Sequence, residues 1–476
     1  MQFFDLITHS GDWSREALEE QAKKHMVCPF EMSLDVSNWA DAVICDYNYV
    51  FDPQAHIKRF FSESGKEEYL FLIDEAHNLV ERGREMYSAS LYKEDLLEVR
   101  KLVKAEDPKL AKRLSECNQQ FLELKRECEH YQILKSVSHI ALKLMNVLSK
   151  LEDYLEECKD AEKKKRVLDF YFAVRSFLNI HDIMDENYVI FSEMMEDGRF
   201  QIKLFCVNPA VNLQNYLEQG SSTIFFSATL LPVHYYKKLL SVEKDDYAVY
   251  AHSSFPQENK FLFIGTDVST RYTRRGESTY QRFARYIAVM AEQKKGNYMA
   301  FFPSYRFLEE VHTCFLECVD HEVDSICQVS YMDEEQREEF LEEFEREREK
   351  SLVAFCVMGG IFSEGIDLTE DKLIGAVIAG TGLPQVCTER EILKQYFNAA
   401  DMDGFDYAYL YPGMNKVLQS AGRVIRTESD RGVILLLDDR FREMRYREVF
   451  PREWQQYQLG SVKNLEQEIR TFWESP

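Results

Sequence analysis

The sequence is poor in basic residues and has no long apolar run, and both absences exclude classes of protein. Its 476 residues include 58 Lys and Arg against 82 Asp and Glu, a net charge of -24. Such a chain does not coat nucleic acid by bulk electrostatics, so any nucleic-acid site has to be a local groove. No apolar run approaches the roughly 20 residues that cross a bilayer, and residues 1–5 lack the basic flank and apolar core of an export signal. We therefore expect no membrane partner.

The cysteines lack the paired spacings of a secreted disulfide framework. There are eleven, an odd number: Cys28, Cys45, Cys117, Cys128, Cys158, Cys206, Cys314, Cys318, Cys327, Cys356 and Cys387. This pattern favours the reducing cytoplasm. The 45% of apolar residues can bury large cores, which excludes a disordered chain. At roughly 100 to 200 residues per domain, the length indicates about three domains.

Glycine is absent from residues 84–197, where Pro108 is the one proline. A stretch without these residues favours helix, and six of its side chains recur at the spacing of one buried helical face. They are Leu144, Val147, Leu148, Leu151, Tyr154 and Leu155. We predict an all-helical insertion over residues 91–205.

Short apolar runs that end in small or acidic residues lie on both sides of this insertion, as buried parallel strands do in α/β domains. The runs are residues 69–73, 223–226, 297–302, 352–357, 373–379, 407–411 and 433–437. The prediction is an α/β protein with one parallel-sheet domain over 41–90 and 206–255 and a second over 256–476. A charge-dense helix at 333–350, with ten acidic and four basic residues, is expected to be a solvated face.

Two adjacent carboxylates, Asp74 and Glu75, follow the apolar run 69–73. Nucleotide hydrolysis needs such a pair: the first acid holds Mg²⁺, usually through water, and the second orients the attacking water. An Asp-Glu pair after a strand is common by itself, and a helix-capping role is the alternative. Its continuation into Ala76 and His77 favours a hydrolase, and the His-Glu-x-x-His spacing of a zinc protease is absent.

Ser227, Ala228 and Thr229 end the run that follows the insertion. Small hydroxyl residues at a strand end can bond the carboxylates of a neighbouring strand and pass on the state of a nucleotide. Taken alone, the segment predicts only a turn. Its position after the acidic pair favours the coupling interpretation.

A glycine-rich loop at residues 359–368 follows the run 352–357. Glycines such as Gly365 let backbone N–H groups approach a phosphate or a ribose, and Glu364 and Asp367 can bond sugar hydroxyls or arginines. A tight connection between a strand and a helix is the alternative.

Two arginines, Arg423 and Arg426, stand three residues apart near the C-terminus. We predict a helix opened by Asn415, which would place both arginines and Gln419 on one face. Two guanidinium groups aimed across a cleft can stabilise the charge on a transferring phosphoryl group. A surface arginine pair is the alternative, but it does not explain Gln419 and Gly422.

The order of these segments resembles motifs II to VI of the superfamily-two helicases of the DinG and XPD type. The segments are residues 74–77, 227–230, 254–256, 301–305, 362–367 and 419–426. The resemblance implies two RecA-like motor domains with a helical insertion called the Arch. It further implies a DEAH-box hydrolase that uses ATP and Mg²⁺ to move 5′ to 3′ along single-stranded DNA in replication or repair.

The resemblance also implies a role for each motif residue. Asp74 would hold Mg²⁺, Glu75 would orient water, and the other catalytic residues would be His77, Arg423 and Arg426. Binding and coupling of ATP would fall to Ser227, Ala228, Thr229, Glu364, Gly365, Asp367, Gln419 and Gly422.

Arginines and tyrosines alternate between residues 271 and 286, where Arg271, Arg274, Arg275 and Tyr280 are the candidate DNA contacts. Guanidinium groups bind phosphates, and aromatic rings stack on bases; Arg282, Arg285, Tyr272 and Tyr286 extend the same cluster. A solvated basic face is the alternative.

Two departures from the family pattern concern the front of the chain. Helicases of this family have a Gly-x-x-x-x-Gly-Lys-[Ser/Thr] phosphate loop, and this sequence has none. Its one Gly-Lys pair, Gly65-Lys66, is followed by Glu67 and has Phe60 at the position of the first glycine. Without that lysine, the chain alone is expected to bind ATP poorly and to be inactive.

The second departure is Cys28, whose context at residues 25–31 resembles that of the last of four iron-sulfur cysteines in the family. A [4Fe–4S] cluster takes four thiolates, and no cysteine precedes Cys28. We interpret residues 1–40 as a remnant of an iron-sulfur domain, with a cluster only in a full-length protein. A small buried hydrophobe is the alternative for Cys28.

Both departures predict a chain that starts inside the iron-sulfur domain, as a fragment, a split gene or a wrongly assigned start. The leading hypothesis is an ATP-dependent DNA helicase, acting as a monomer. The first alternative is a catalytically inactive helicase-like module that binds nucleic acid or protein. An RNA helicase of the same superfamily would not explain the insertion or the Cys28 segment.

Overall fold

The computed structural model describes residues 14–61, 68–243, 245–362, 368 and 372–475. It divides into two compact units, Met1–Phe61 and Ser62–Pro476. Within residues 14–61 the helices are α2 (Arg15–His25), α3 (Pro29–Ser37) and α4 (Asn48–Phe51). Ala22 and Met32 are buried in its small core, with Leu18 and Val36 packed against them. The predicted domain boundaries stay predictions.

The second unit contains a parallel sheet of two strands, β1 (Leu70–Ile73) and β6 (Ser222–Phe225). Their register pairs Ile73 with Phe225, so both strands end at the same edge. The short helix η1 (Ala76–Asn78) and α5 (Leu79–Met86) follow β1, whereas α11 (Val233–Leu240) follows β6 and α10 (Ala210–Leu217) precedes it. Motifs that are far apart in sequence thereby meet at one sheet edge.

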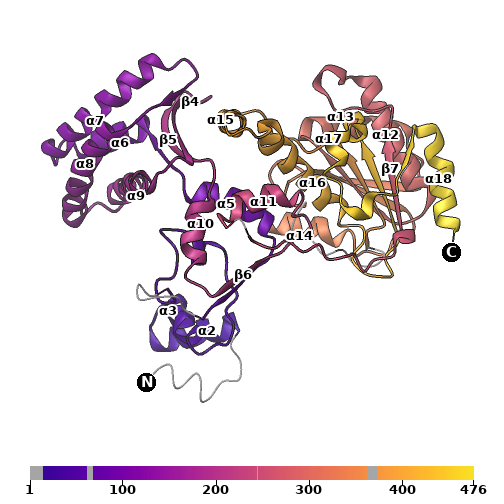
Figure 1. Cartoon of the computed structure of the whole chain (residues 1–476), viewed down its shortest axis with the longest axis horizontal. Helices are drawn as coiled ribbons and strands as arrows, with labels where there is room; N and C mark the ends of the chain where they lie inside the picture. Colours follow the sequence, from indigo (N-terminus) through magenta and orange to yellow (C-terminus); the bar gives the residue numbers. More distant parts are fainter. Residues whose placement is uncertain (1–13, 62–67, 244, 363–367, 369–371, 476) are drawn as a thin grey trace. The chain divides into compact units, whose positions relative to one another are not determined.

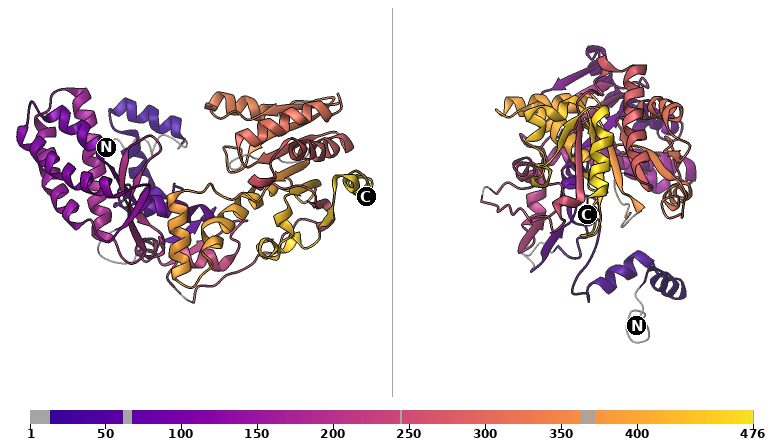
Figure 2. Two further views of the ribbon diagram at one scale, coloured as in Figure 1. Left: turned by 90° about the horizontal axis from the view of Figure 1, so that it is seen from above. Right: turned by 90° about the vertical axis from the view of Figure 1, so that its right-hand side faces the viewer.

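The insertion between these two strands contains four long helices. They are α6 (Lys93–Val103), α7 (Pro108–Glu127), α8 (Ser138–Glu157) and α9 (Ala161–Ile183). The helices pack side by side in the order of the chain, as the purple segment shows (Figures 1 and 2). The predicted face of α8 is confirmed: Leu144, Val147, Leu151, Tyr154 and Leu155 are buried, and Leu148 packs against the same core.

The prediction that the insertion is all-helical is wrong, because it also carries an antiparallel sheet in the order β2-β5-β4-β3. The strands are β2 (Ala89–Tyr92), β3 (Tyr131–Leu134), β4 (Tyr188–Met194) and β5 (Phe200–Cys206). A lack of glycine and proline excludes tight turns but not strands, whose interiors also avoid both residues. Aromatic and β-branched residues in β4 favour the extended form.

The largest sheet of this unit has seven parallel strands in the order β13-β7-β12-β11-β8-β10-β9. They are β7 (Lys260–Gly265), β8 (Asn297–Phe302), β9 (Val323–Cys327), β10 (Ser351–Val357), β11 (Gly375–Ala379), β12 (Gly432–Leu437) and β13 (Gln458–Gly460). The α/β fold class is thereby confirmed.

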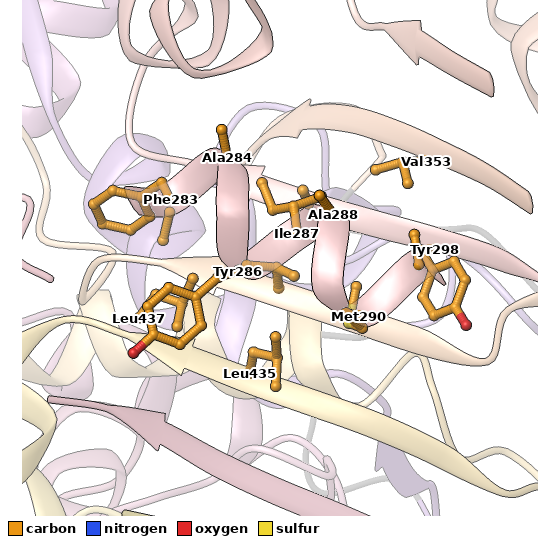
Figure 3. Packing of buried hydrophobic residues seen from close by; sticks show 14 of the residues in the cluster. Phe283, Ala284, Tyr286, Ile287, Ala288, Met290, Tyr298, Val353, Leu435 and Leu437 are labelled. Atoms are coloured by element: carbon orange, nitrogen blue, oxygen red, sulfur yellow. The ribbon is translucent and has the colours of Figure 1, made fainter. Parts of the chain in front are cut away.

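Helices pack on this sheet through apolar side chains. Figure 3 shows Phe283, Tyr286 and Met290 of α12 (Glu277–Gln293) beside Leu435 and Leu437 of β12. The remaining long helices are α13 (Tyr305–Cys318), α14 (Glu334–Glu342), α15 (Thr388–Ala399), α16 (Tyr411–Ala421) and α18 (Val462–Glu474). None of the helices that the structure describes is both long and apolar enough to cross a membrane.

Two further predictions are corrected in this part of the chain. Residues 407–411 are not a strand: a π-helical turn, η5 (Asp406–Leu410), runs directly into α16. The alternating tyrosines suggested a strand, but Tyr407 packs against Tyr235 and Phe397, so tertiary contacts override the local preference. The charged helix is shorter than expected, since α14 ends at Glu342 after a capping box at its start.

Candidate nucleotide-hydrolysis site

The acidic pair lies immediately after β1, with both side chains exposed. Glu75 adopts a left-handed backbone with φ of 46°, and its N–H donates to Asp74 Oδ1 at 2.7 Å. Residues other than glycine seldom adopt this conformation, and such strain concentrates at functional sites. The turn holds the two carboxylates at the edge where β6 also ends.

A hydrogen-bond network joins this turn to the segment after β6. Ser227 Oγ donates to Glu75 Oε2 at 3.0 Å and accepts from the Thr229 N–H at 3.1 Å. His77 Nδ1 lies 2.8 Å from Ser227 Oγ, 3.2 Å from Thr229 Oγ1 and 3.2 Å from Glu75 Oε2. The His77 side chain is 1% exposed, so nearly all of its interactions are with protein groups. Ala228 is exposed at the turn between the two hydroxyl residues.

The other ring nitrogen of His77 contacts helix α16, which belongs to the part of the chain that carries the seven-stranded sheet. Gln419 of α16 places its side-chain nitrogen 2.5 Å from His77 Nε2. In the tautomer whose Nε2 accepts from the Gln419 amide, the ring carries its proton on Nδ1. That proton faces Glu75 Oε2 and Ser227 Oγ. One imidazole therefore bridges the acidic pair and α16.

This network lowers the pKa of Glu75. The hydrogen bond from His77 is the largest cause, burial acts in the opposite direction, and Ser227 and the positive charge of Arg423 lower the pKa further. A glutamate is ionised at neutral pH, and the lowered pKa extends the ionised state to more acidic pH. An ionised Glu75 is the state that can accept a hydrogen bond from a water molecule.

The arginines lie elsewhere than predicted. Helix α16 begins at Tyr411 and ends at Ala421, so Arg423 and Arg426 lie in the following loop and not on a helical face with Gln419; the predicted start at Asn415 is also wrong. Gly422 is the C-cap, and helices commonly end near glycine. Arg423 is half-buried and acts on the pKa of Glu75, whereas Arg426 is exposed.

An aspartate holds this loop in place. Asp430 Oδ2 accepts from the backbone N–H groups of Arg426 at 2.7 Å and of Thr427 at 2.8 Å. The Thr427 hydroxyl donates to Asp430 Oδ1 at 2.6 Å. The backbone that carries Arg426 is therefore fixed although its side chain is exposed.

The glycine-rich loop is described only at its beginning. Gly359 follows β10 with φ of 72°, a conformation that favours glycine. Phe362 is buried and stacks on Phe340 with ring centroids 4.2 Å apart. Glu364, Gly365 and Asp367 lie outside the described residues.

The candidate DNA contacts are largely engaged with other protein groups. Arg271 pairs with Glu443 at 2.6 Å, and Arg274 pairs with Asp439 at 2.9 Å. Arg275 Nε donates to the Thr270 carbonyl at 3.1 Å. Acidic neighbours thus offset the charge of this face.

The tyrosines of this cluster also differ from the prediction. Tyr280 packs edge-on against Phe307 of the core, and Tyr286 is fully buried. Stacking of Tyr286 on a base is therefore wrong, because its ring has no accessible face. Tyr272 remains exposed.

The cysteines do not form a metal centre. Cys28 is exposed at the N-cap of α3, and residues 14–61 contain one other cysteine, Cys45. Within the part of the chain that the structure describes, no group of three or more His, Cys, Asp or Glu side chains could hold a metal ion. These residues do not fit an iron-sulfur cluster, which takes four thiolates.

An ionic network near the site was not predicted from the sequence. Glu81 Oε1 of α5 accepts from Arg84 at 2.7 Å and from Arg390 of α15 at 3.2 Å, and Arg84 is 2% exposed. Burial raises the pKa of Glu81, but the two guanidinium groups outweigh it and lower the pKa overall. The network is a second link between the elements after β1 and those of the seven-stranded sheet.

Comparisons with known proteins agree with this arrangement. Residues 287–457 match the model of a helicase C-terminal domain, and residues 5–96 match the model named DEAD_2. The chain belongs to the superfamily-two helicases of the XPD and DinG type.

Two relatives show how much of the sequence is shared. The chain is 24% identical to the ATP-dependent DNA helicase XPD of Sulfolobus acidocaldarius, over 90% of this chain and 74% of that relative. It is 23% identical to the ATP-dependent DNA helicase CHL1 of Saccharomyces cerevisiae, over 95% of this chain and 59% of that relative.

Solved structures share the fold. A structure of an XPD helicase superposes with a TM-score of 0.59 at 20% identity, covering 92% of this chain and 77% of the other. The Xpd4 structure of S. tokodaii gives a TM-score of 0.58 at 16% identity, covering 87% and 81%. The parallel sheets of this chain therefore correspond to the RecA-like domains of XPD helicases.

Proposed function

We propose that this protein is an ATP-dependent DNA helicase that moves 5′ to 3′ along single-stranded DNA in replication or repair. The observation that carries the proposal is the bridge of His77 between Glu75 and Gln419. A buried imidazole that joins the carboxylate of one sheet to a helix of the other domain can pass a change at the nucleotide to the second domain. Two relatives that are ATP-dependent DNA helicases support the substrate and the energy source.

Asp74 is suited to hold Mg²⁺, because its carboxylate is exposed at the strand end, and Mg²⁺ is commonly bound by one or two carboxylates together with substrate phosphates. When bound, the metal offsets negative charge on the phosphates of ATP. Glu75, kept ionised by its neighbours, orients the attacking water. His77 fixes the Glu75 carboxylate, and Ser227 and Thr229 fix the ring of His77.

The second domain contributes through three residues. Gln419 contacts His77, so a movement of α16 changes the position of the imidazole. Arg423 adds positive charge beside Glu75. Arg426 is proposed to reach the transferring phosphoryl group, since its side chain is exposed on a loop whose backbone Asp430 fixes. Charge stabilisation by such an arginine changes rates by roughly 10³ to 10⁵ where it has been measured.

The sequence contains no phosphate loop. We propose that ATP turnover depends on a phosphate loop that a further polypeptide segment supplies. The alternative, an inactive helicase-like binding module, does not require Glu75, His77 and Gln419 to be held together by hydrogen bonds. The network around His77 therefore favours hydrolysis. A cytoplasmic location, a monomeric state and an iron-sulfur cluster in a full-length protein stay predictions.

The test uses protein purified from the organism that naturally produces it, through an affinity tag at the C-terminal end. ATP hydrolysis is measured with and without a thymidine 30-mer. We expect stimulation by the DNA, and a loss of about 10² to 10⁴ in Glu75→Gln, the range for removal of a general base. Glu347→Gln, which changes an exposed acid outside the site, should leave the rate unchanged. Equal rates for Glu75→Gln and the unmodified protein would refute the assignment.

A further inference from the structure

A groove runs between helices α7 and α8 of the insertion, away from the network around His77. Its volume is about 400 Å³. The lining residues are Lys109, Lys112, Arg113, Glu116, Lys143, Asn146 and Lys150. Figure 1 shows the two helices next to each other in the purple bundle, and Lys143 Nζ donates across them to the Glu116 carbonyl at 3.1 Å.

The groove follows from the amphipathic pattern of the two helices. On α7 the lining positions are 109, 112, 113 and 116, and on α8 they are 143, 146 and 150, the i, i+3, i+4, i+7 spacing of one helical face. The neighbouring positions carry the buried side chains Leu110, Leu114, Leu144, Val147 and Leu151. Packing of the apolar faces therefore brings the two basic faces together along one seam.

The charge of the groove is opposite to that of the chain. Five cations and one carboxylate line it, in a protein of net charge -24. Lys150 pairs with Asp153 at 2.5 Å. Across the described part of the chain, no ion pair involves Lys109, Lys112 or Arg113. The three neighbouring cations of α7, which form none of these ion pairs, concentrate a positive potential that attracts an anion.

We propose that this groove binds the phosphodiester backbone of a single strand of nucleic acid. Protein interfaces are depleted in lysine and anchored by aromatic side chains, whereas four of the five cations here are lysines and the lining has no apolar residue. Without aromatic residues the groove cannot stack bases, so contact with the backbone would be independent of sequence. The concave space between two helices admits one backbone more readily than a duplex.

The size of the groove sets the expected strength of the contact. Lys109 and Glu116 of α7 are seven positions apart, about 10 Å at 1.5 Å per residue. At roughly 3.4 Å per phosphate, the spacing along one strand of a duplex, the groove faces at most about three phosphates. Each phosphate contact to a single strand contributes about 0.7 to the slope of log affinity against log salt. The contribution of the groove to DNA affinity does not depend on ATP hydrolysis.

The test measures binding of the full chain to a labelled thymidine 30-mer over roughly 50 to 200 mM salt. Lys109→Glu with Lys112→Glu reverses two groove charges. Lys164→Glu with Lys165→Glu makes the same change of net charge at exposed positions of α9. We expect the groove variant to lose about tenfold in affinity at low salt and about 1.4 in slope, two phosphate contacts. The control should change the affinity by less than about twofold.

Several outcomes would overturn the proposal. Equal losses in both variants would mean that net charge matters and the groove does not. A loss confined to duplex DNA would assign a duplex ligand, and a polyglutamate peptide that binds more tightly than the 30-mer would assign an acidic protein. If the groove variant binds as the unmodified chain does, the groove proposal fails alone; if the unmodified chain binds no DNA, the proposed helicase function fails with it. Lys109→Gln with Lys112→Gln, which adds no acid, should show about half the loss in log affinity.

Discussion

The two parallel sheets of the second unit differ sharply in burial. All six residues of β12 in the seven-stranded sheet are buried, whereas Leu70 and Leu72 of β1 are 70% and 68% exposed, and Ile224 of β6 is 56% exposed. Yet the acidic pair and Ser227 stand at the end of the exposed sheet. Stability and chemistry are therefore concentrated in different parts of the molecule.

The largest expected contrast is in stability. Leu435→Ala removes a fully buried side chain from β12 and should lower the free energy of unfolding by about 4 kcal/mol, through lost burial and a cavity. Leu72→Ala removes an exposed side chain and should change it by less than about 0.5 kcal/mol. Denaturant unfolding of both variants checks the contrast. Similar losses would mean that the two sheets are equally packed.

Glu81→Gln tests the ionic link between α5 and α15. The pKa of Glu81 is lowered in the folded protein, so its stabilising contribution is present at neutral pH and is lost as pH falls through the lowered pKa. The Glu81 side chain is 44% exposed, so solvent screens its interaction with the buried Arg84, and we expect a loss of about 1 kcal/mol at pH 7. The difference from the unmodified protein should shrink as the pH falls below 4.5, the ordinary pKa of a glutamate.

Thermal or denaturant unfolding across pH measures this difference. A destabilisation that stays constant down to acid pH would contradict the ionic account. The exposed control Glu347→Gln should show no comparable change at any pH.

Tyr286→Phe should have the smallest effect in the seven-stranded domain. The Tyr286 hydroxyl donates to Asp267 at 2.5 Å, and its loss should cost about 1 kcal/mol. Unfolding in denaturant at neutral pH measures the cost. A loss as large as that of Leu435→Ala would show that this hydrogen bond matters more than packing.

Much of the seven-stranded sheet could be predicted from sequence, because strands buried on both faces are continuous apolar runs. Three of its strands were not among the predicted runs. Strand β7 is an apolar run that the prediction missed, β9 mixes Asp324 and Ser325 with apolar residues, and β13 is three residues long. The run at 407–411 has the composition of a strand, and only its contacts with Tyr235 and Phe397 explain the helical turn.

The part of the site that could be predicted is the part made of residues in the recognised motifs. The structure brings Glu75, His77, Ser227 and Gln419 together, as the order of motifs suggested. The loop position of Arg423 was not predictable from spacing, since residues three apart share a face only if the helix continues. The Glu81–Arg390 pair joins residues more than 300 positions apart, and no local pattern indicates such a partner.

The most direct test of the account is a double-mutant cycle on His77 and Gln419, measured as DNA-stimulated ATP hydrolysis by the tagged protein from its own cells. If the two side chains act as one unit, His77→Ala and Gln419→Ala should each lower the rate by about 10²-fold and their combination by little more, because residues of one unit are not additive. Losses that multiply to about 10⁴-fold, or no loss in either variant, would contradict the bridge between the two domains.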